Sequence, residues 1–281
     1  MTCRLLATVA WAVVFLPHTH AEVLFSISGD PNNSFVPDVF SSLTDSPGSL
    51  ATIAVLGGGS LGFNGGLTVG PGSVLYAIAN DSLGASSLYT VQPNGATSLV
   101  GSAGGLGFGF LGGLAWDSAN STFYAAVNDS LGNTTLDSIT PGGTAASTGM
   151  ALGTGFSGLA YDSANGLFYG IGNDFTGFSI LYDFSIGGPV NAVGGLGFGF
   201  GALTYSAANN AFWAIDPVNN AGSQLFQISS GGVVSAPFYM LGDGFVELAV
   251  SPAAGVPEPA TSVLLGTGLI LAGCFLRRRK S

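Results

Sequence analysis

The stretch GLAWDSANSTFYAAV at residues 113–127 returns as GLAYDSANGLFYGIG at residues 158–172, and this pattern decides the fold. Each copy holds two short runs in which apolar residues alternate with small or polar ones. Aromatic and β-branched residues are frequent in both runs. A period of two with this composition is typical of β-strands rather than helices.

The first run recurs five times along the chain. Its leucines lie at intervals of 47, 45, 44 and 45 residues, and they are Leu67, Leu114, Leu159, Leu203 and Leu248. The second run follows the first four of them, at residues 75–79, 123–127, 168–172 and 212–216. A period of about 45 residues is the signature of a repeat architecture.

A third strand is predicted in each repeat, at residues 87–91, 135–139, 180–184 and 224–228, and a turn rich in Pro or Gly follows each. A weaker fourth strand then leads into a glycine-rich connection. Four short antiparallel strands per repeat of about 45 residues match one blade of a β-propeller. The alternative is an open β-solenoid or a stack of hairpins, although solenoid coils are usually shorter and need distinct caps.

The two ends of the repeat region each offer an incomplete blade. Residues 24–28 fit the second strand without a first strand before them, and residues 248–252 fit the first strand without a second one after them. Pairing the two would leave no sheet edge open. We therefore predict an all-β, five-bladed β-propeller that is closed by pairing of the N- and C-terminal strands in one blade. Six blades are the alternative, if residues 30–65 hold further strands.

Residues 255–281 differ in composition from the repeats. An apolar run at residues 260–276 separates a Pro-Glu-Pro tripeptide from a basic cluster; these residues are Pro257, Glu258, Pro259 and then Arg277, Arg278, Arg279 and Lys280. Seventeen helical residues span about 25 Å, which is near the lower limit for crossing a bilayer. By the positive-inside rule the basic cluster stops transfer and stays in the cytoplasm, so everything before Pro257 lies across the membrane.

This tail closely resembles the PEP-CTERM sorting signal of Gram-negative bacteria that make extracellular polysaccharide. The resemblance covers the tail only. It implies recognition by an exosortase, a membrane-embedded cysteine transpeptidase that cleaves near the Pro-Glu-Pro motif and releases or transfers the rest of the chain. An ordinary C-terminal membrane anchor is the alternative, and it leaves the tripeptide unexplained.

The N-terminal residues predict export as well. Arg4, an apolar run at residues 5–16 and a cleavage site ending at Ala21 follow the order of a secretory signal peptide. We expect a signal peptide at 1–21, a propeller at 22–254 and a sorting segment at 255–281 with a transmembrane helix at 260–276. The protein would cross the inner membrane of a Gram-negative bacterium, be anchored there transiently and end at the cell surface or in the extracellular matrix.

The predicted mature domain contains no cationic side chain. No Lys, Arg, His or Cys occurs from Glu22 to Val256, and 14 of the 15 acidic residues lie there, so its formal charge is −14. Serine and cysteine triads, Schiff-base lysines and His or Cys metal sites are excluded because their side chains are missing. Nucleic acid is excluded as a partner because binding it requires cations that displace the counterions of the phosphates.

Three Asn-Asp pairs lie between second and third strands, and their carboxylates are Asp81, Asp129 and Asp174. Their ordinary role is turn formation, because both residue types tolerate left-handed backbone and bond their own main chain. The functional interpretation is a ring of oxygen ligands for Ca²⁺, or of groups that bond sugar hydroxyls. No stretch has the dense Asp and Asn alternation of a dedicated calcium loop.

The heptapeptide at residues 104–110 recurs identically at residues 194–200, and it is expected on the same rim as the Asn-Asp pairs. It is not a nucleotide-binding loop, because no helical segment follows. Packing between blades is the ordinary role of its aromatic rings. Where exposed, the rings would stack on sugars; the candidates are Phe108, Phe110, Phe198 and Phe200.

Glu247 is the only glutamate within the repeats, and it is expected near the central channel. A lone glutamate there is more often structural. The sequence favours a non-catalytic binding or structural component associated with exopolysaccharide, with no catalytic residue, and this role rests on the family of the tail. The alternative is a carboxylate-dependent polysaccharide hydrolase or lyase, which would use Glu247 as its acid or base.

Overall fold

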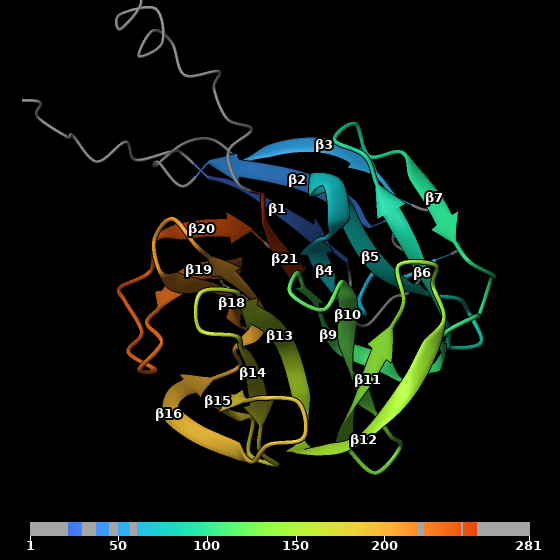
Figure 1. Ribbon diagram of the computed structural model, residues 1–281. Coiled ribbons are helices and arrows are strands. Elements are labelled where there is room, and N and C mark those ends of the chain that lie inside the picture. Colours follow the sequence, from blue (N-terminus) through green and yellow to red (C-terminus); the bar gives the residue numbers. More distant parts are fainter. Residues whose placement is uncertain are drawn as a thin grey trace, which may run out of the picture.

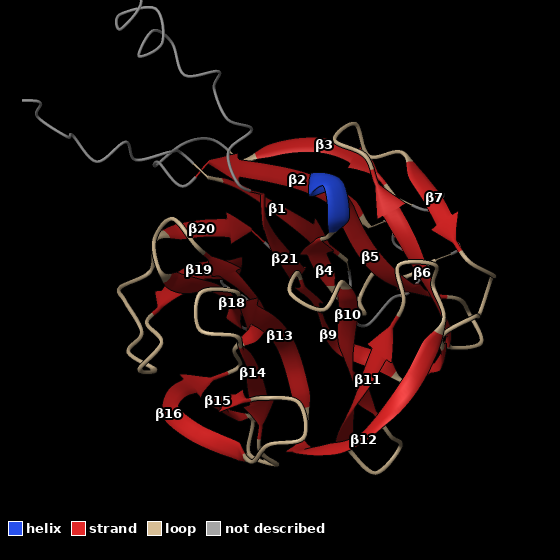
Figure 2. Cartoon of the chain, in the orientation of Figure 1, coloured by secondary structure: helices blue, strands red, loops and turns tan. Residues whose placement is uncertain are grey.

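The computed structural model describes residues 22–29, 38–44, 50–56, 61–218, 222–242 and 244–251. In these residues 21 strands form five antiparallel sheets arranged like blades around a central axis (Figures 1 and 2). Within the described part of the chain, the 3₁₀ turn η2 (Pro71–Ser73) is the sole helical element. The prediction of an all-β, five-bladed propeller is confirmed, and the solenoid alternative is wrong.

Four blades are each continuous in sequence. The first consists of β4 (Leu67–Val69), β5 (Leu75–Asn80), β6 (Ala85–Val91) and β7 (Thr97–Val100), with β8 (Gly107–Phe108) also paired to β6. The second consists of β9 (Phe110–Asp117), β10 (Thr122–Asn128), β11 (Asn133–Ile139) and β12 (Ala145–Thr154). The third consists of β13 (Phe156–Asp162), β14 (Leu167–Asn173), β15 (Phe178–Phe184) and β16 (Val190–Phe198). The fourth consists of β17 (Gly201–Ser206), β18 (Ala211–Val218), β19 (Gly222–Ile228) and β20 (Tyr239–Gly242).

The fifth sheet combines segments from both ends of the described chain (Figure 1). Its strands are β1 (Val23–Ser28), β2 (Val39–Thr44), β3 (Ala51–Val55) and β21 (Phe245–Ser251). β21 lies antiparallel beside β1, with Val23 opposite Ser251 and Phe25 opposite Ala249. β2 and β3 belong to this sheet, so the described part of residues 30–65 adds no sixth blade.

The first strand of every blade lies closest to the axis, and these strands are β4, β9, β13, β17 and β21 (Figure 1). We call the face where they begin the entry face and the face where they end the exit face. The hairpins between second and third strands lie on the entry face. Val23 and Ser251 pair at the exit face, so the described chain starts and stops there.

A Gly-Phe pair precedes or opens each first strand. The five rings are only 1–5% exposed, and they belong to Phe63, Phe110, Phe156, Phe200 and Phe245. Each ring lies in a different one of five core clusters, and each cluster joins two neighbouring blades. The hydrophobic core is therefore divided among the blade junctions, as expected when each sheet buries its faces against its neighbours.

A carboxylate at the exit face stabilises the turn between first and second strands in three blades. Asp117 accepts a bond from the Asn120 amide at 2.7 Å, and Asp162 accepts the same bond from Asn165. The equivalent turn after β17 carries Ser206 instead. There Glu22, the first residue of the predicted mature domain, supplies the carboxylate and accepts bonds from the Ser206 hydroxyl and the Asn209 amide.

Replacing Glu22 with Ala is expected to lower the free energy of unfolding by about 1–3 kcal/mol, because the buried Ser206 hydroxyl and the exposed Asn209 amide lose their acceptor. Glu22→Gln keeps an acceptor oxygen and should cost less than about 1 kcal/mol. Ser206→Asp introduces at this turn the aspartate that the other two turns carry as Asp117 and Asp162. This substitution should recover stability in the Glu22→Ala background. Urea denaturation measures all three variants, and a Glu22→Ala protein as stable as the parent would contradict this role.

Candidate functional site

The first strands surround a channel that widens at the entry face into a cavity of about 310 Å³. Polar side chains in its wall come from Asn64, Ser157, Asn173 and Glu247, and apolar ones from Leu111, Phe200, Ala202, Ile215, Phe245 and Val246. A volume of this size is at the lower end of the range for small-molecule sites. The mouth of the channel at the entry face is therefore the candidate site.

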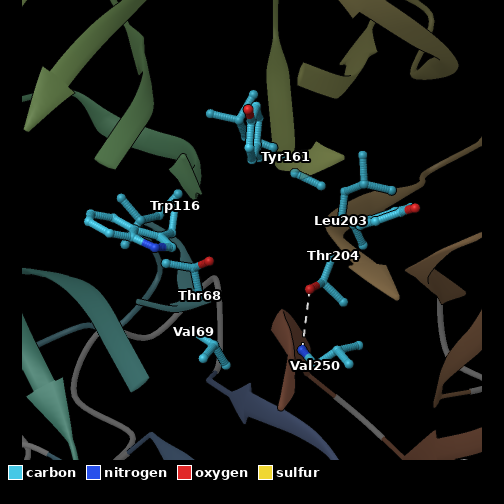
Figure 3. A pocket seen from close by; sticks show the side chains of 11 residues that line it. Thr68, Val69, Trp116, Tyr161, Leu203, Thr204 and Val250 are labelled. Atoms are coloured by element: carbon cyan, nitrogen blue, oxygen red, sulfur yellow. Dashed lines mark hydrogen bonds between the residues drawn. The ribbon is translucent and has the colours of Figure 1, made fainter. Parts of the chain in front are cut away.

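The exit end of the channel holds a smaller cavity of about 90 Å³ (Figure 3). Trp116 and Tyr161 lie on one side of it, and Thr204 on the other accepts a hydrogen bond from the Val250 N–H at 3.2 Å. Burial, followed by the nearby Asp162 carboxylate, raises the pKa of Tyr205 in this wall to about 12. Bulky side chains therefore narrow the channel at the exit face.

Glu247 stands at a position where the other four first strands carry a small residue. The equivalents in the repeat are Gly66, Gly113, Gly158 and Ala202. A Cβ added to Gly66 would lie 2.4 Å from the backbone nitrogen of Leu114 in the next blade, and one added to Gly158 would lie 2.8 Å from that of Leu203. Because neighbouring blades approach each other so closely, the repeat requires a small residue at this position. Glu247 is the exception.

The Glu247 side chain is 6% exposed and bonds the backbone of the neighbouring blade, at the N–H groups of Gly66 and Leu67. Burial raises the pKa of Glu247 to about 8, the charge of Asp38 adds to this rise, and the two backbone bonds oppose it. Because pH 7 lies below this pKa, the carboxyl group holds its proton there.

Asp38 is the second departure from the repeat, and it lies in the same blade as Glu247. In three junctions the N–H of the buried phenylalanine donates to a hydroxyl; the pairs are Phe156 with Thr134, Phe200 with Ser179 and Phe245 with Ser223. In the junction after the fifth sheet, the Phe63 N–H donates to the Asp38 carboxylate instead. Asp38 is 7% exposed, and burial raises its pKa.

The pH dependence of stability should report on Glu247. Its native pKa lies above the ordinary value of 4.5, so the native state holds a proton that the unfolded state releases. The free energy of unfolding should therefore fall between pH 4.5 and about pH 8, by at most about 1.4 kcal/mol per pH unit, and then level off.

Glu247→Gln should flatten this part of the stability curve, leaving the smaller fall of the same sign from Asp38. Urea denaturation at intervals from pH 4 to pH 9 measures both proteins. Asp38→Asn is the matched control, because it removes the other buried acid and leaves the Glu247 titration in place. Parallel curves for the parent and the Gln variant would rule out a raised pKa at Glu247.

The three candidate calcium ligands form turns. One oxygen of Asp81 accepts the N–H groups of Leu83 and Ala85, and the equivalent bonds tie Asp129 and Asp174 into their own hairpins. Bonds from Asn133 lower the pKa of Asp129, and the Thr176 hydroxyl lowers that of Asp174. The carboxylates sit in three separate blades, and the described residues contain no group of three or more His, Cys, Asp or Glu that could hold a metal ion.

The asparagines that precede these carboxylates bond other strands of their own blade, and Asn128 also bonds the next blade. Asn173 donates to the Ser157 hydroxyl at 2.8 Å, and its carbonyl oxygen accepts the Ser179 hydroxyl. Asn128 accepts the Thr134 hydroxyl in the same way and donates to the Phe156 carbonyl. The two residues of the pair thus have different roles: Asn bonds neighbouring strands, across the junction in the case of Asn128, and Asp shapes the turn.

The candidate aromatic residues separate into two pairs. Phe108 and Phe198 are 68% and 66% exposed, whereas Phe110 and Phe200 are buried in the blade junctions. Phe110 and Phe200 therefore pack inside the blade junctions instead of standing exposed on the rim, although Phe200 also lines the entry-face cavity. The intervening glycines, Gly109 and Gly199, have φ angles of +87° and +82° and turn the chain inward between the two rings of each motif.

Phe108 lies beside the Asn-Asp turn of the next blade, as expected from the strand polarity. A shallow depression there is lined by Phe108, Val127, Asn128, Asp129 and Asn133. The hairpin tips add exposed apolar side chains, and these are Leu83, Leu131 and Phe175. The entry face thus presents apolar groups and carboxylates around the cavity, and we call this set of residues the rim.

Sequence reasoning placed Glu247 near the channel but overlooked Asp38, Asn64 and Ser157. Aligning the junction hydroxyls of the repeats would have marked Asp38, because it replaces Ser or Thr at a buried position. Ala21, the Pro-Glu-Pro motif, the basic cluster and the predicted helix at 260–276 lie outside the described residues. Within the described ranges, no helix has the length and apolar character needed to cross a membrane.

Comparison with known proteins assigns the tail. The model of the PEP-CTERM protein-sorting motif matches residues 255–280. The motif supports an exported protein that an exosortase recognises and that its C-terminus anchors transiently in the membrane. No curated protein matches the chain in sequence.

Solved structures with a similar fold include a chain of a nidogen/laminin complex, at 11% identity and a TM-score of 0.52 over 83% of this chain and 99% of that one. TolB from Acinetobacter baumannii is 12% identical, with a TM-score of 0.48 over 77% of this chain and 53% of its own. A gluconolactonase from Xanthomonas campestris is 11% identical, with a TM-score of 0.46 over 81% and 79%. Such low identities show the fold alone.

Proposed function

We propose that this protein is a non-catalytic binding or structural component of a cell-surface or extracellular polysaccharide matrix, delivered there by exosortase processing. The observation that carries the proposal is the sorting motif at residues 255–280. The composition supports a non-catalytic role, because the propeller lacks every Lys, Arg, His and Cys from which common nucleophiles and bases are built. Its charge of −14 favours neutral or cationic polymers over anionic ones.

We further infer that the β1–β21 pairing closes the ring in the exported protein and sets its orientation. The last described residue, Ser251, lies at the exit face, nine positions before the predicted membrane segment begins at Ala260. An exit face turned toward the membrane points the entry face outward. In this orientation the rim residues Phe108 and Phe198 meet extracellular polymer, and their rings stack on sugar faces.

Substituting Pro257, Glu258 and Pro259 together with alanine tests the sorting step. The producing cells should then accumulate an unprocessed chain in the membrane, whereas the parent should appear as a shorter product outside it, as measured by immunoblotting of cell fractions. Replacing the tripeptide leaves the apolar run and the basic cluster intact, so a simple anchor would behave identically in both strains. Identical fractionation would contradict exosortase processing.

Retention of polymer tests the binding role. Purified processed protein on a solid support should retain the producer's own polysaccharide without changing its length, as measured by size-exclusion chromatography before and after contact. Phe108→Ala together with Phe198→Ala should weaken retention without unfolding the protein, because both rings are exposed. Absence of retention by the parent protein would refute the binding role.

A carboxylate-dependent polysaccharide hydrolase or lyase is the second candidate. The observation that favours it is a buried acid with a pKa of about 8 near a second carboxyl group, Asp38, since such glycosidases use two carboxyl groups as acid and base or nucleophile. Shortening of the polymer by the parent protein, and its loss in Glu247→Gln, would establish this candidate in place of the binding role.

A further inference from the structure

Two buried carboxyl groups occur in one blade at positions where the rest of the ring has none. Glu247 replaces a Gly or Ala of the other four first strands, and Asp38 replaces a hydroxyl at the blade junction. The other junctions form without an acid at either position, so the fold does not require these groups. Departures from a repeat that reduce stability are expected at functional sites.

Burial of these groups is unfavourable because the domain offers no cationic side chain as a counter-charge. No Lys, Arg or His exists between Glu22 and Val256, so an ionised Glu247 cannot form an ion pair with any side chain of the predicted mature domain. Two backbone N–H groups satisfy part of its hydrogen-bonding capacity. A desolvated carboxyl without a cation attracts one, and the surrounding charge of −14 raises the local concentration of cationic ligands.

The wall of the cavity indicates which kind of cation fits. A metal ion needs several oxygen ligands of high charge, but Glu247 is the only acidic residue among those lining the cavity, and the rest of the lining is amide, hydroxyl and apolar. An ammonium group needs acceptors for three N–H donors and an apolar wall for its carbon frame. Glu247 and Ser157 provide acceptor oxygens, and Leu111, Phe200 and Ile215 provide the apolar wall.

We propose that the cavity at the entry face binds a primary ammonium group, that of an unsubstituted amino sugar in the matrix polysaccharide, with Glu247 as its counter-ion. The identity of the polymer rests on the proposed function above, whereas the recognition of ammonium rests on the cavity alone. A volume of about 310 Å³ accommodates one sugar unit at the mouth of the channel. Asn64 and Asn173 lie in the same wall and are placed to bond its hydroxyl groups.

Binding should release a proton. Before the ligand binds, Glu247 is protonated at pH 7. It becomes a carboxylate when the ammonium enters, so its proton passes to the buffer and the charges balance. The association constant should therefore rise up to tenfold per pH unit between pH 5 and pH 7, where the ligand keeps its charge. A neutral sugar would show no such dependence.

Isothermal titration calorimetry of the processed protein with D-glucosamine, D-glucose and N-acetyl-D-glucosamine tests the proposal. Glucosamine should bind at least tenfold more tightly than the two neutral sugars, and the heat should vary with the ionisation enthalpy of the buffer. Glu247→Gln should lose this preference and the proton release while unfolding at the same or a higher temperature at pH 7. Equal binding of glucosamine and glucose, or an unchanged preference in the variant, would overturn the proposal.

Three further titrations separate the ligand sources. Cadaverine paired with 1,5-pentanediol presents the ammonium without a sugar ring, and tighter binding of cadaverine than of glucosamine would overturn the assignment to amino sugars. Calcium chloride alone should produce no Glu247-dependent heat, and a calcium site lost in Glu247→Gln would overturn the ammonium assignment. Glucosamine binding without polymer retention would support the ammonium site and refute the matrix role. Polymer retention that is unchanged by Glu247→Gln would support the matrix role and refute the ammonium site.

Discussion

Replacing Gly113 with Ala is expected to lower the free energy of unfolding by about 3–5 kcal/mol. Gly113 has a φ of +103°, which an alanine adopts at a cost of about 1–2 kcal/mol. Its added Cβ would also lie 2.5 Å from the backbone nitrogen of Leu159, and forced separation of a packed junction adds about 1–3 kcal/mol. Both atoms belong to first strands, so relief requires adjacent blades to separate at the axis.

Gly153→Ala is the matched control. Gly153 has a similar φ of +112°, but nothing lies within 4 Å of the added Cβ, so only the backbone cost of about 1–2 kcal/mol should remain. Ala202 occupies the position equivalent to Gly113 in another blade and carries a Cβ there, with a φ of +41°. A Cβ is therefore not excluded at this position in every blade. The close approach of Leu159 is what makes the cost at Gly113 larger than the cost at Gly153. Urea denaturation of both variants gives the comparison, and equal losses would contradict the tight ring of first strands.

Phe110→Ala is expected to destabilise the protein by about 3–5 kcal/mol, because the ring is 1% exposed and fills the junction between the blades that begin with β4 and β9. Phe108→Ala, two residues earlier in the same heptapeptide, removes a ring that is 68% exposed and should change the free energy of unfolding by less than about 0.5 kcal/mol.

Thermal and urea unfolding of the two phenylalanine variants should therefore differ widely, although the substitutions are chemically identical. A third variant, Phe200→Ala, repeats the buried case in the second copy of the motif and should resemble Phe110→Ala. Similar losses at Phe108 and Phe110 would show that the motif packs differently from this arrangement.

The strand pattern and the blade count could be read from the sequence because each blade repeats the same local signals. Alternation in the run beginning at Leu114 specifies a strand that buries one face, and the spacing of about 45 residues then specifies four strands per repeat. These properties depend on neighbouring residues and on period, so a single sequence suffices to show them.

The site was less accessible to sequence reasoning because it depends on how blades meet. Phe108 and Phe110 occupy equivalent alternating positions in the sequence, and only the left-handed conformation of Gly109 sends one outward and the other into the core. Asp38 and Glu247 are far apart in the chain and share a blade through the pairing of β1 with both β2 and β21. Their proximity is a property of this shared sheet rather than of any repeat.

The most direct test of the account is a cross-link between β1 and β21 in the exported protein. With Cys3 and Cys274 replaced by serine, Val23→Cys and Ser251→Cys should form a disulfide under mild oxidation, seen as a faster-migrating band without reductant, because the two residues are direct strand partners. The control pair Val23→Cys and Ser147→Cys lies in two different sheets and should stay reduced. Rapid cross-linking of the first pair alone is the predicted result; no cross-link in it, or equal cross-linking of both pairs, would contradict a ring closed by its two ends.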